Sequence, residues 1–310
     1  MRKTRIFQVL LSIVLIFTLP IIAKGETMFS KQPIISVKIS AYLCKFDLRV
    51  NDVSVASNKR DFPTEVTIPV NHWIQNGSNT ISLIQDISEQ DSMEGSSCEV
   101  TLLVKENGTD KSTAKSITNI KLLEGVNNSS GESRLNSNTL QVTENGNIIS
   151  NKVSFKDEQD KLVLQRVISL PIVLPKWKWF SGDLISDTKE TRASLYAEYE
   201  KVHSALKSVG LSYIRQVFNE RLIELGAAFY KAPQEMASLS GLQDSVIDPE
   251  LELVPLDPDI EVEIMGNNRL IKITRWNSEP QVGYVYKDGS ATVGYHLIYR
   301  KKGNQWILTR

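Results

Sequence analysis

The 310-residue chain is poor in the residues that build metal sites and disulfide-rich folds, because it has only two Cys and three His. Two cysteines cannot form a four-cysteine zinc site or the framework of a disulfide-dense miniprotein. The chain also has no excess of charge of one sign, since 36 Lys and Arg stand against 36 Asp and Glu. Zero net charge gives no reason to expect a nucleic acid as partner. The 41% of hydrophobic residues is enough for real cores, and the length predicts about two domains.

The sequence also lacks the motifs of the common catalytic and cofactor-binding classes. No two of His72, His203 and His296 have the spacing of a zinc site, and neither a nucleophile elbow nor a phosphate-binding glycine loop is present. The alternating acids of residues 257–263 lack the D-x-D-x-D-G spacing of a calcium loop. We therefore expect no cofactor and no metal ion, and we assign no catalytic residue.

The strongest signal in the chain is its beginning. A short basic segment precedes an uncharged, mostly apolar run over residues 6–22, which ends near the small residue Ala23. This pattern is typical of a secretory signal peptide, so we predict that residues 1–25 are removed after export. An uncleaved anchor is the alternative, because the run is just long enough to span a bilayer, although Pro20 favours a signal. The Leu- and Ile-rich signal indicates a periplasmic or secreted protein without a membrane partner after cleavage.

Export sets the expected state of Cys44 and Cys98. A lone pair of cysteines in an oxidising compartment usually forms a disulfide, and each of the two lies in a strand-like run. We therefore predict a Cys44–Cys98 disulfide that closes a loop of about 55 residues and stabilises by about 3–5 kcal/mol on the chain-entropy estimate. Catalytic or metal-binding thiols are the alternative, which the absence of a CxxC spacing disfavours.

The first half of the chain has an all-β pattern. Short alternating or β-branched runs are separated by turn dipeptides, as in a sandwich or Greek-key barrel. We predict a β-sandwich domain over residues 26–124, an Asn/Ser/Gly-rich linker over residues 125–138, and further strands with a Trp-rich junction over residues 139–180. The strands predicted for the sandwich domain cover residues 34–40, 42–50, 66–70, 80–84, 99–104 and 117–122.

One segment of this all-β region suggests a kind of module. Residues 68–81 contain a loop with an apolar anchor at Trp73, then Gly77-Ser78-Asn79 before a strand. This arrangement resembles a segment of galactose-binding-like jelly rolls and related Ig-like sandwich modules. The resemblance implies a binding or structural module, not a catalytic one.

Trp177 and Trp179 are candidate contacts to a ligand or partner. Strand alternation predicts that both indoles share one face, with Lys176 and Lys178 on the other. An aromatic platform for a sugar or peptide is one hypothesis. We favour the other, that both tryptophans close a domain junction, because Trp is usually part of a core.

Residues 181–310 have the pattern of an α+β domain. Asp187 as N-cap, with Glu190 three residues later, predicts the start of a long helix. An apolar stripe predicts a second long helix over residues 211–229, whose opposite side is polar. We therefore predict two domains: the disulfide-bonded sandwich, then an α+β domain with two long helices and a C-terminal antiparallel sheet. The polar side of the second helix carries Arg215, Glu220, Arg221 and Glu224.

Two long helices followed by an antiparallel meander resemble the α+β cone of the nuclear-transport-factor-like family. Members often end on a Gly-x-x-Trp-Ile type strand, as Gly303, Trp306 and Ile307 do here. The resemblance covers residues 188–310, and it implies a cavity that holds a small ligand, where an Asp/His pair sometimes performs acid–base work. It also implies a third helix within residues 234–250.

His296 is the only candidate for acid–base chemistry in such a cavity. It lies in a long strand predicted over residues 292–299, and alternation can place it on one face with Tyr284 and Tyr286. These three residues are therefore further candidate ligand contacts. A histidine beside tyrosines in a sheet is more often a hydrogen-bonded core residue, so catalysis is the weaker hypothesis.

Charge is unevenly distributed near the C-terminus. Residues 232–268 carry nine acids and no Lys or Arg, whereas residues 269–310 carry eight basic residues and two acids. We interpret the acids that alternate over residues 257–263 as one face of a strand opposite a basic neighbour or water. The two charged segments are also available to steer a partner.

Two functional hypotheses follow. The first is an exported, non-enzymatic binding protein that contacts a protein or glycan at the cell envelope; an inhibitor or immunity-type protein fits this plan. The second is a small-ligand-binding protein or enzyme that uses the C-terminal cavity around His296. Glycosylation sequons begin at Asn76, Asn107, Asn127 and Asn128, and they matter only in a glycosylating host.

Overall fold

The computed structural model describes residues 31–59, 62–86, 97–123, 147–156, 161–208, 211–276 and 278–310. The predicted signal peptide, the predicted linker and the sequons at Asn127 and Asn128 lie outside these residues. The described chain is mostly β, with four antiparallel sheets, a few helices and one disulfide. Among the described helices, none is both long and apolar enough to cross a membrane.

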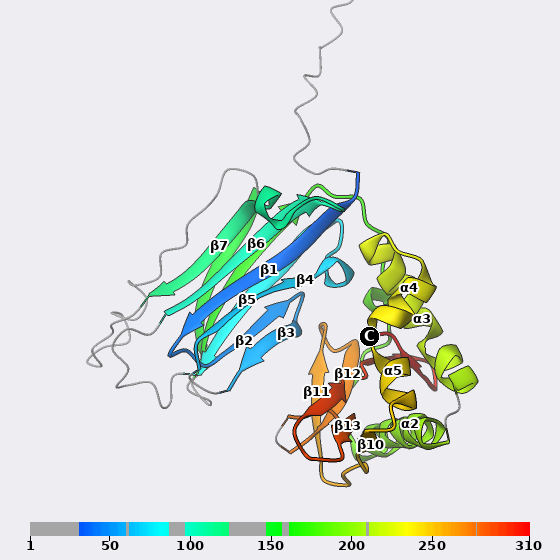
Figure 1. The fold of residues 1–310 in the computed structure, drawn as a ribbon. Helices are drawn as coiled ribbons and strands as arrows, with labels where there is room; N and C mark the ends of the chain where they lie inside the picture. Colours follow the sequence, from blue (N-terminus) through cyan, green and yellow to red (C-terminus); the bar gives the residue numbers. More distant parts are fainter. Residues whose placement is uncertain are drawn as a thin grey trace, which may run out of the picture.

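Two sheets built from the first part of the chain pack face to face, and we call them the sandwich (Figure 1). Their strands are β1 (Pro33–Tyr42), β2 (Phe46–Val50), β3 (Val53–Asn58), β4 (Thr64–Pro69), β5 (Gly77–Asp86), β6 (Ser97–Glu106), β7 (Lys115–Leu123), β8 (Asn147–Lys156) and β9 (Lys161–Leu170). One sheet has the order β4-β1-β6-β7 and the other has the order β3-β2-β5-β9-β8. Short 3-10 turns interrupt the loops at η1 (Asn71–Trp73) and η2 (Lys111–Thr113).

Alternation of apolar and polar residues explains the two faces of these sheets. In β2, Phe46, Leu48 and Val50 are buried between the sheets, whereas Asp47 and Arg49 lie on the outer face. The predicted disulfide is confirmed: Cys44 and Cys98 are bonded, with Cα atoms 6.1 Å apart and both side chains fully buried. It joins the segment between β1 and β2 to β6, which is the neighbour of β1 in the first sheet.

The sandwich contains strands that the sequence pattern places elsewhere or does not indicate. β3 is absent from the predicted strands, because its small residues Ser54, Ala56 and Ser57 give little alternation. β9, from the segment after the predicted linker, pairs with β5 along its whole length, from Gly77 opposite Leu170 to Asp86 opposite Lys161. β8 and β9 therefore complete the second sheet of the sandwich.

The C-terminal part comprises four helices and two small sheets. The helices are α2 (Lys189–Lys207), α3 (Leu211–Phe229), α4 (Pro233–Leu239) and α5 (Leu242–Ile247). The strands are β10 (Leu251–Leu253), β11 (Ile260–Met265), β12 (Leu270–Arg275), β13 (Val282–Tyr286), β14 (Thr292–Tyr295), β15 (Tyr299–Lys302) and β16 (Gln305–Leu308). They form the sheets β10-β13-β14 and β11-β12-β15-β16. Figure 1 shows β11 and β12 next to the sandwich and the helices beyond them.

The start of α2 differs from the prediction by one residue. Its N-cap is Thr188, whose Oγ1 accepts a hydrogen bond from the Thr191 amide at 3.1 Å. Asp187 is instead bound by Arg192, whose Nε and Nη2 each donate to a carboxylate oxygen at 2.7 Å. The prediction that Asp187 caps the helix is therefore wrong, because a bidentate arginine occupies its carboxylate.

The prediction of one long strand over residues 292–299 is also wrong, because this segment forms two strands that belong to different sheets. β14 ends at Tyr295 and pairs with β13, whereas β15 begins at Tyr299 and pairs with β12 and β16. The residues between them switch sheets, held by the Ile298 amide donating to the Arg310 carbonyl at 2.8 Å and the Thr309 amide donating to Ile298 at 2.9 Å. The switch takes His296 out of regular strand pairing.

Candidate functional site

The sandwich meets the C-terminal part at an aromatic junction formed by Trp73, Trp177 and Trp179. Trp177 is 1% and Trp179 is 0% exposed. The indole N–H of Trp177 donates to the Ile74 carbonyl at 2.7 Å, and that of Trp179 donates to the His72 carbonyl at 3.3 Å. Because both indoles are buried and hydrogen-bonded to the sandwich, they pack this junction and present no face to solvent.

The segment that carries these tryptophans is not a strand. Trp177 precedes a 3-10 turn, η4 (Lys178–Ser181), so the predicted strand is wrong. The two sides are nevertheless as predicted, because both indoles are buried whereas Lys176 and Lys178 are exposed. The Trp179 ring stacks on Phe180, with centroids 3.7 Å apart, and meets Trp73 edge to face at 5.9 Å. The hydrophobic core of the sandwich thus continues through the junction.

Tyr284 and Tyr286 lie on β13. Tyr284 is buried in the second hydrophobic core, where its ring meets Tyr295 edge to face at 6.4 Å. Burial raises the pKa of Tyr284 to about 12. Tyr286 lies opposite Leu251 of β10. Neither tyrosine lines the cleft that contains His296, so the structure does not bring the three candidates together.

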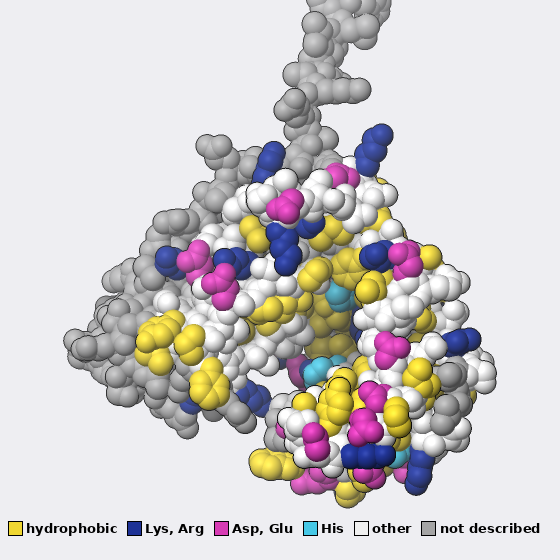
Figure 2. Space-filling view, in the orientation of Figure 1, with side chains coloured by type: hydrophobic (Ala, Val, Ile, Leu, Met, Phe, Trp, Pro, Cys, Tyr) yellow, Lys and Arg dark blue, Asp and Glu magenta, His cyan; other side chains and the backbone are white. Residues whose placement is uncertain are grey.

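A second meeting place of the two parts is an open cleft of about 620 Å³. Its sandwich wall is the outer face of β2, β3, β5 and β9, and its other wall is the β11–β12 hairpin with Ser278 and His296. Figure 2 shows the open space between the sandwich and the C-terminal part, with a histidine side chain at its edge.

The walls of the cleft carry more positive than negative charge. Among the residues that the structure describes, Asp47 and Glu263 are the acids that line it. An excess of charge of one sign on the low-dielectric walls of a cleft focuses the electrostatic potential, which is positive in this cleft. Its five cations are Lys45, Arg49, Lys59, Lys161 and Lys272.

Ion pairs join the two walls at the base of the cleft. Arg49 Nε lies 2.7 Å from Asp47 Oδ2 and its Nη2 lies 3.6 Å from Glu263 Oε1. The other oxygen of Glu263 lies 2.9 Å from Lys272 Nζ. The acidic strand therefore faces a basic neighbour at this position, as the sequence predicts. Across the mouth, Lys59 Nζ donates to the Ser278 hydroxyl.

Two turns fix the closed end of the cleft. The β2–β3 turn has Asn51 and Asp52 at φ of 49° and 64°, and the β11–β12 turn has Gly266 at 62°. Asn, Asp and Gly adopt this left-handed backbone most readily. The Gly266 amide donates to the Asp52 carbonyl at 3.1 Å, and the Asn267 amide donates to Asp52 Oδ2 at 2.9 Å. The turn residues thus hold one wall against the other.

His296 lines the cleft and keeps contact with its solvent. Desolvation by the surrounding protein, together with the charges of Lys272 and Arg221, lowers the pKa of His296 to about 4. The ring is therefore neutral near pH 7. Its pKa lies well below the value near 7 that suits a general base at this pH. The charges that act on it are cations, not the carboxylate of an Asp/His pair.

The three histidines lie in three different environments. His72 packs in the junction against Trp73, with ring centroids 4.6 Å apart, and His203 Nε2 lies 2.9 Å from the Val254 carbonyl. Among the residues that the structure describes, no group of three or more His, Cys, Asp and Glu side chains is placed to hold a metal ion.

The cleft is a site that the sequence pattern does not indicate. Its cations come from segments as far apart in the sequence as Lys45 and Lys272. Each segment taken alone has the pattern of an ordinary strand with one solvated face. The signal in the sequence that points to the cleft is the outward-facing basic residues of β2 and β12. These residues become neighbours only because the two sheets dock.

Comparison with known proteins adds no relative: no family model, no curated protein and no solved structure matches this chain. The resemblances to nuclear-transport-factor-like cones and to galactose-binding-like sandwiches stay predictions. The function of the cleft is therefore inferred from its geometry and charge.

Proposed function

We propose that this chain is an exported, non-enzymatic binding protein that holds an acidic segment of a protein or glycan at the cell envelope. The observation that carries the proposal is the cleft of about 620 Å³, whose described lining has five Lys and Arg side chains against two acids. The Arg49 and Lys272 ion pairs with Glu263 are partly solvent-exposed. Such pairs contribute little to stability, about 0–1 kcal/mol, so an incoming carboxylate competes with them at low cost.

Export is part of this proposal. The buried Cys44–Cys98 disulfide supports it, because disulfides persist in oxidising compartments. We propose that residues 1–25 are removed as a signal peptide, that the sandwich and the C-terminal part are two domains, and that neither nucleic acid nor membrane is a partner. N-terminal sequencing of the exported protein tests the cleavage.

An inhibitor or immunity-type role fits this plan better than catalysis does. Such proteins bind an acidic or basic surface of a target through charge complementarity and need no reactive group. The alternative, an enzyme or small-ligand carrier that uses His296, has less support because the His296 pKa of about 4 and its cationic surroundings suit anion binding better than proton abstraction.

Charge reversal in the cleft tests the proposal. We expect the wild-type protein to bind poly-L-glutamate or polygalacturonate with an affinity that falls as salt is raised from 50 to 200 mM, roughly as screening predicts. The double variant K59E/K161E changes two lining lysines and should weaken binding at least tenfold. The matched control K38E/K121E changes two lysines paired with Glu65 and Glu99 on the other sheet. Equal binding by both variants, or none by the wild type to either polymer, contradicts the proposal.

A further inference from the structure

Three buried polar atoms without a hydrogen-bond partner belong to residues that meet at the junction: His72 Nδ1, Arg221 Nη1 and Arg310 Nε. They are three of the seven such side-chain atoms in the described part of the chain. Arg310 Nη2 donates to the His72 carbonyl at 3.1 Å. The charges of Arg310 and Arg221 both lower the pKa of His72, and the charge of Arg310 lowers the pKa of Arg221. We call these three residues the donor cluster.

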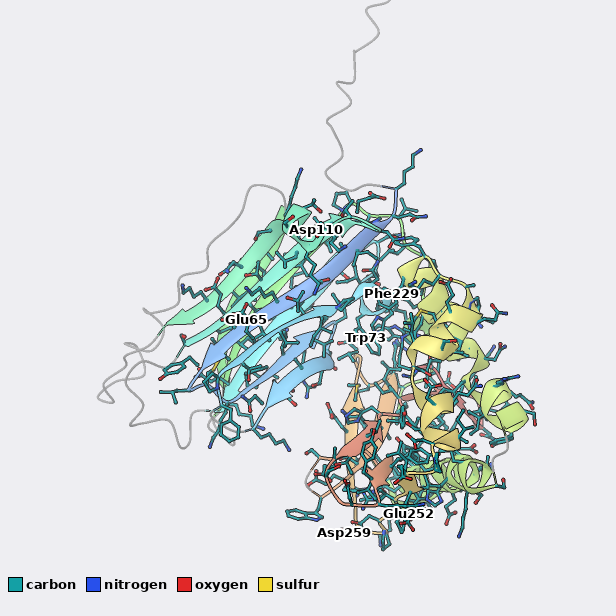
Figure 3. The ribbon with its side chains drawn as sticks, in the orientation of Figure 1. Glu65, Trp73, Asp110, Phe229, Glu252 and Asp259 are labelled. Atoms are coloured by element: carbon teal, nitrogen blue, oxygen red, sulfur yellow. A yellow bond between two sulfur atoms is a disulfide. The ribbon has the colours of Figure 1, made fainter. Side chains whose placement is uncertain are left out.

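The donor cluster lies between the sandwich and the helices. The His72 ring packs against Phe229 at the end of α3, with centroids 5.4 Å apart, and Figure 3 places Trp73 on the sandwich side and Phe229 on the helix side. The C-terminal end of the chain is marked in the same region of Figure 1. In Figure 2 the molecule is hollowed here, with hydrophobic side chains on the floor.

The acids near the donor cluster already have partners. Glu224 Oε2 lies 2.7 Å from Arg310 Nη1, and both residues are at least 94% buried. Glu220 accepts two hydrogen bonds from Arg300, at 2.8 Å each. Each of these two carboxylates therefore balances one arginine, which leaves the charge of Arg221 without a counter-ion among them.

Arg221 is the uncompensated member. The contact that its guanidinium makes is with the ring of Phe218, one turn earlier on α3, at 5.5 Å from the centroid. Burial and the charge of Arg310 lower its pKa to about 10, and no acid raises it. A buried ion without a partner is costly, so such a group is expected to have a counter-ion in the functional state. Arg221 as a whole is partly buried: its Nη1 has no contact with solvent, whereas another part of the residue is exposed.

We propose that the donor cluster binds a single oxyanion group, a carboxylate or phosphate, of a small ligand. Arg221 and Arg310 would each donate an N–H to it, since guanidinium groups match the geometry of such oxygens. The neutral His72 ring would supply a third donor through Nδ1–H. This site goes beyond the proposed function, because none of its three residues lines the cleft.

Thermal unfolding of the full-length protein in oxyanion salts tests this site. The wild type and R221M are compared at pH 7 in sodium chloride, sodium phosphate and sodium acetate of equal ionic strength. Because phosphate stabilises most proteins by exclusion from their surface, the measured quantity is the difference in Tm shift between the two proteins. R215M is the matched control, since Arg215 lies on the same helix and is exposed.

We expect phosphate or acetate to raise the Tm of the wild type and of R215M by several degrees more than that of R221M. R221M should be at least as stable as the wild type in chloride, because it lacks the unpaired buried charge. A larger effect of phosphate than of acetate identifies a phosphoryl ligand, and the reverse identifies a carboxylate. Equal anion shifts in R221M and the wild type overturn the proposal, as does the absence of any specific shift in the wild type.

A second variant keeps the test decisive where R221M does not fold. R221K keeps the charge but loses the planar fork, so calorimetric titration with inorganic phosphate or acetate should show at least tenfold weaker binding than the wild type. Undiminished binding by R221K overturns the proposal. The cleft variant K59E/K161E should keep wild-type oxyanion binding, so the two sites fail or succeed independently.

Discussion

In the part of the chain that the structure describes, the sandwich and the C-terminal part meet at the aromatic junction and at the cleft, and these two contacts have opposite chemistry. At the junction, Trp73, Trp177 and Trp179 are buried, and the core of the sandwich runs on without a break. At the cleft, Arg49 and Glu263 face each other across solvent-accessible space. Buried aromatic surface stabilises strongly, whereas exposed ion pairs contribute about 0–1 kcal/mol. The junction therefore contributes most of the stability of this contact, and the ion pairs of the cleft contribute little.

Removing an aromatic ring from the junction should have the largest effect on stability, and it tests whether the junction is the structural contact. Trp179→Ala should lower the free energy of unfolding by about 3–5 kcal/mol, because it leaves a large cavity in a fully buried site. Trp276→Ala is the matched control, since Trp276 is 68% exposed and should change stability by less than about 0.5 kcal/mol. Urea unfolding measures both. Similar small effects of the two substitutions would show that the junction is not the structural contact.

The disulfide gives the next largest effect and lies within the sandwich. Its residues are 54 apart in the sequence. Replacing both Cys44 and Cys98 by Ala should cost about 2–4 kcal/mol, less than the chain-entropy estimate of about 3–5 kcal/mol, because the unfolded chain without the bridge retains some structure. Because the bridge belongs to neither contact, binding of poly-L-glutamate by the folded variant should stay unchanged. A loss of binding under folding conditions would mean that the sandwich wall of the cleft depends on the bridge.

Local features of the fold are predictable from the sequence, because they depend on residues close in the chain. The apolar stripes of α2 and α3 and the strand around Cys98 follow from periodicity. The strand predicted over residues 42–50 is wrong in its first part, because Leu43 adopts a φ of 48° and the chain passes there from β1 of one sheet to β2 of the other, which leaves Cys44 between the two strands. The sheet switch around His296 is not predictable in this way. It depends on β14 pairing with β13 and β15 pairing with β12, which is decided by tertiary docking.

The same limit applies to the two sites. Arg221 and Glu224 occupy the polar side of α3, which a helical pattern predicts to face solvent, yet Glu224 is 6% exposed. The junction covers that side, so a polar stripe becomes a buried ionic cluster. Likewise the cations of the cleft become neighbours only because Asp52 binds the amides of the β11–β12 turn.

That turn contact can be tested with a matched pair of aspartates. Asp52→Ala removes the acceptor for the Asn267 amide and should cost about 1 kcal/mol. Asp110→Ala removes a similar acceptor, for the Ser112 amide at 2.8 Å, on the outside of the sandwich (Figure 3). We expect similar small losses of stability from both substitutions. Only Asp52→Ala should alter binding of poly-L-glutamate, and an equal effect of both on binding would remove Asp52 from the cleft architecture.

The smallest effect that we expect is a pH dependence contributed by His296. Its pKa is about 4 in the folded protein, below the ordinary value of 6.5. Between these values the unfolded chain binds more protons than the folded one, so stability must fall as the pH falls through this window. The contribution is complete above about pH 6.5, and solvent in the cleft keeps it small. Urea unfolding at several pH values measures it.

The substitution His296→Gln isolates this contribution, because His72, whose pKa is lowered mainly by burial, titrates in the same direction and is left in place. We expect the variant to lose less stability than the wild type between pH 6.5 and pH 4. A bound polyanion neutralises Lys272 and its neighbours and so raises the His296 pKa towards its ordinary value. Saturating poly-L-glutamate should therefore flatten the wild-type profile towards that of the variant. If the pH profiles of stability differ between wild type and variant but stay the same when poly-L-glutamate is added, the polyanion does not bind near His296.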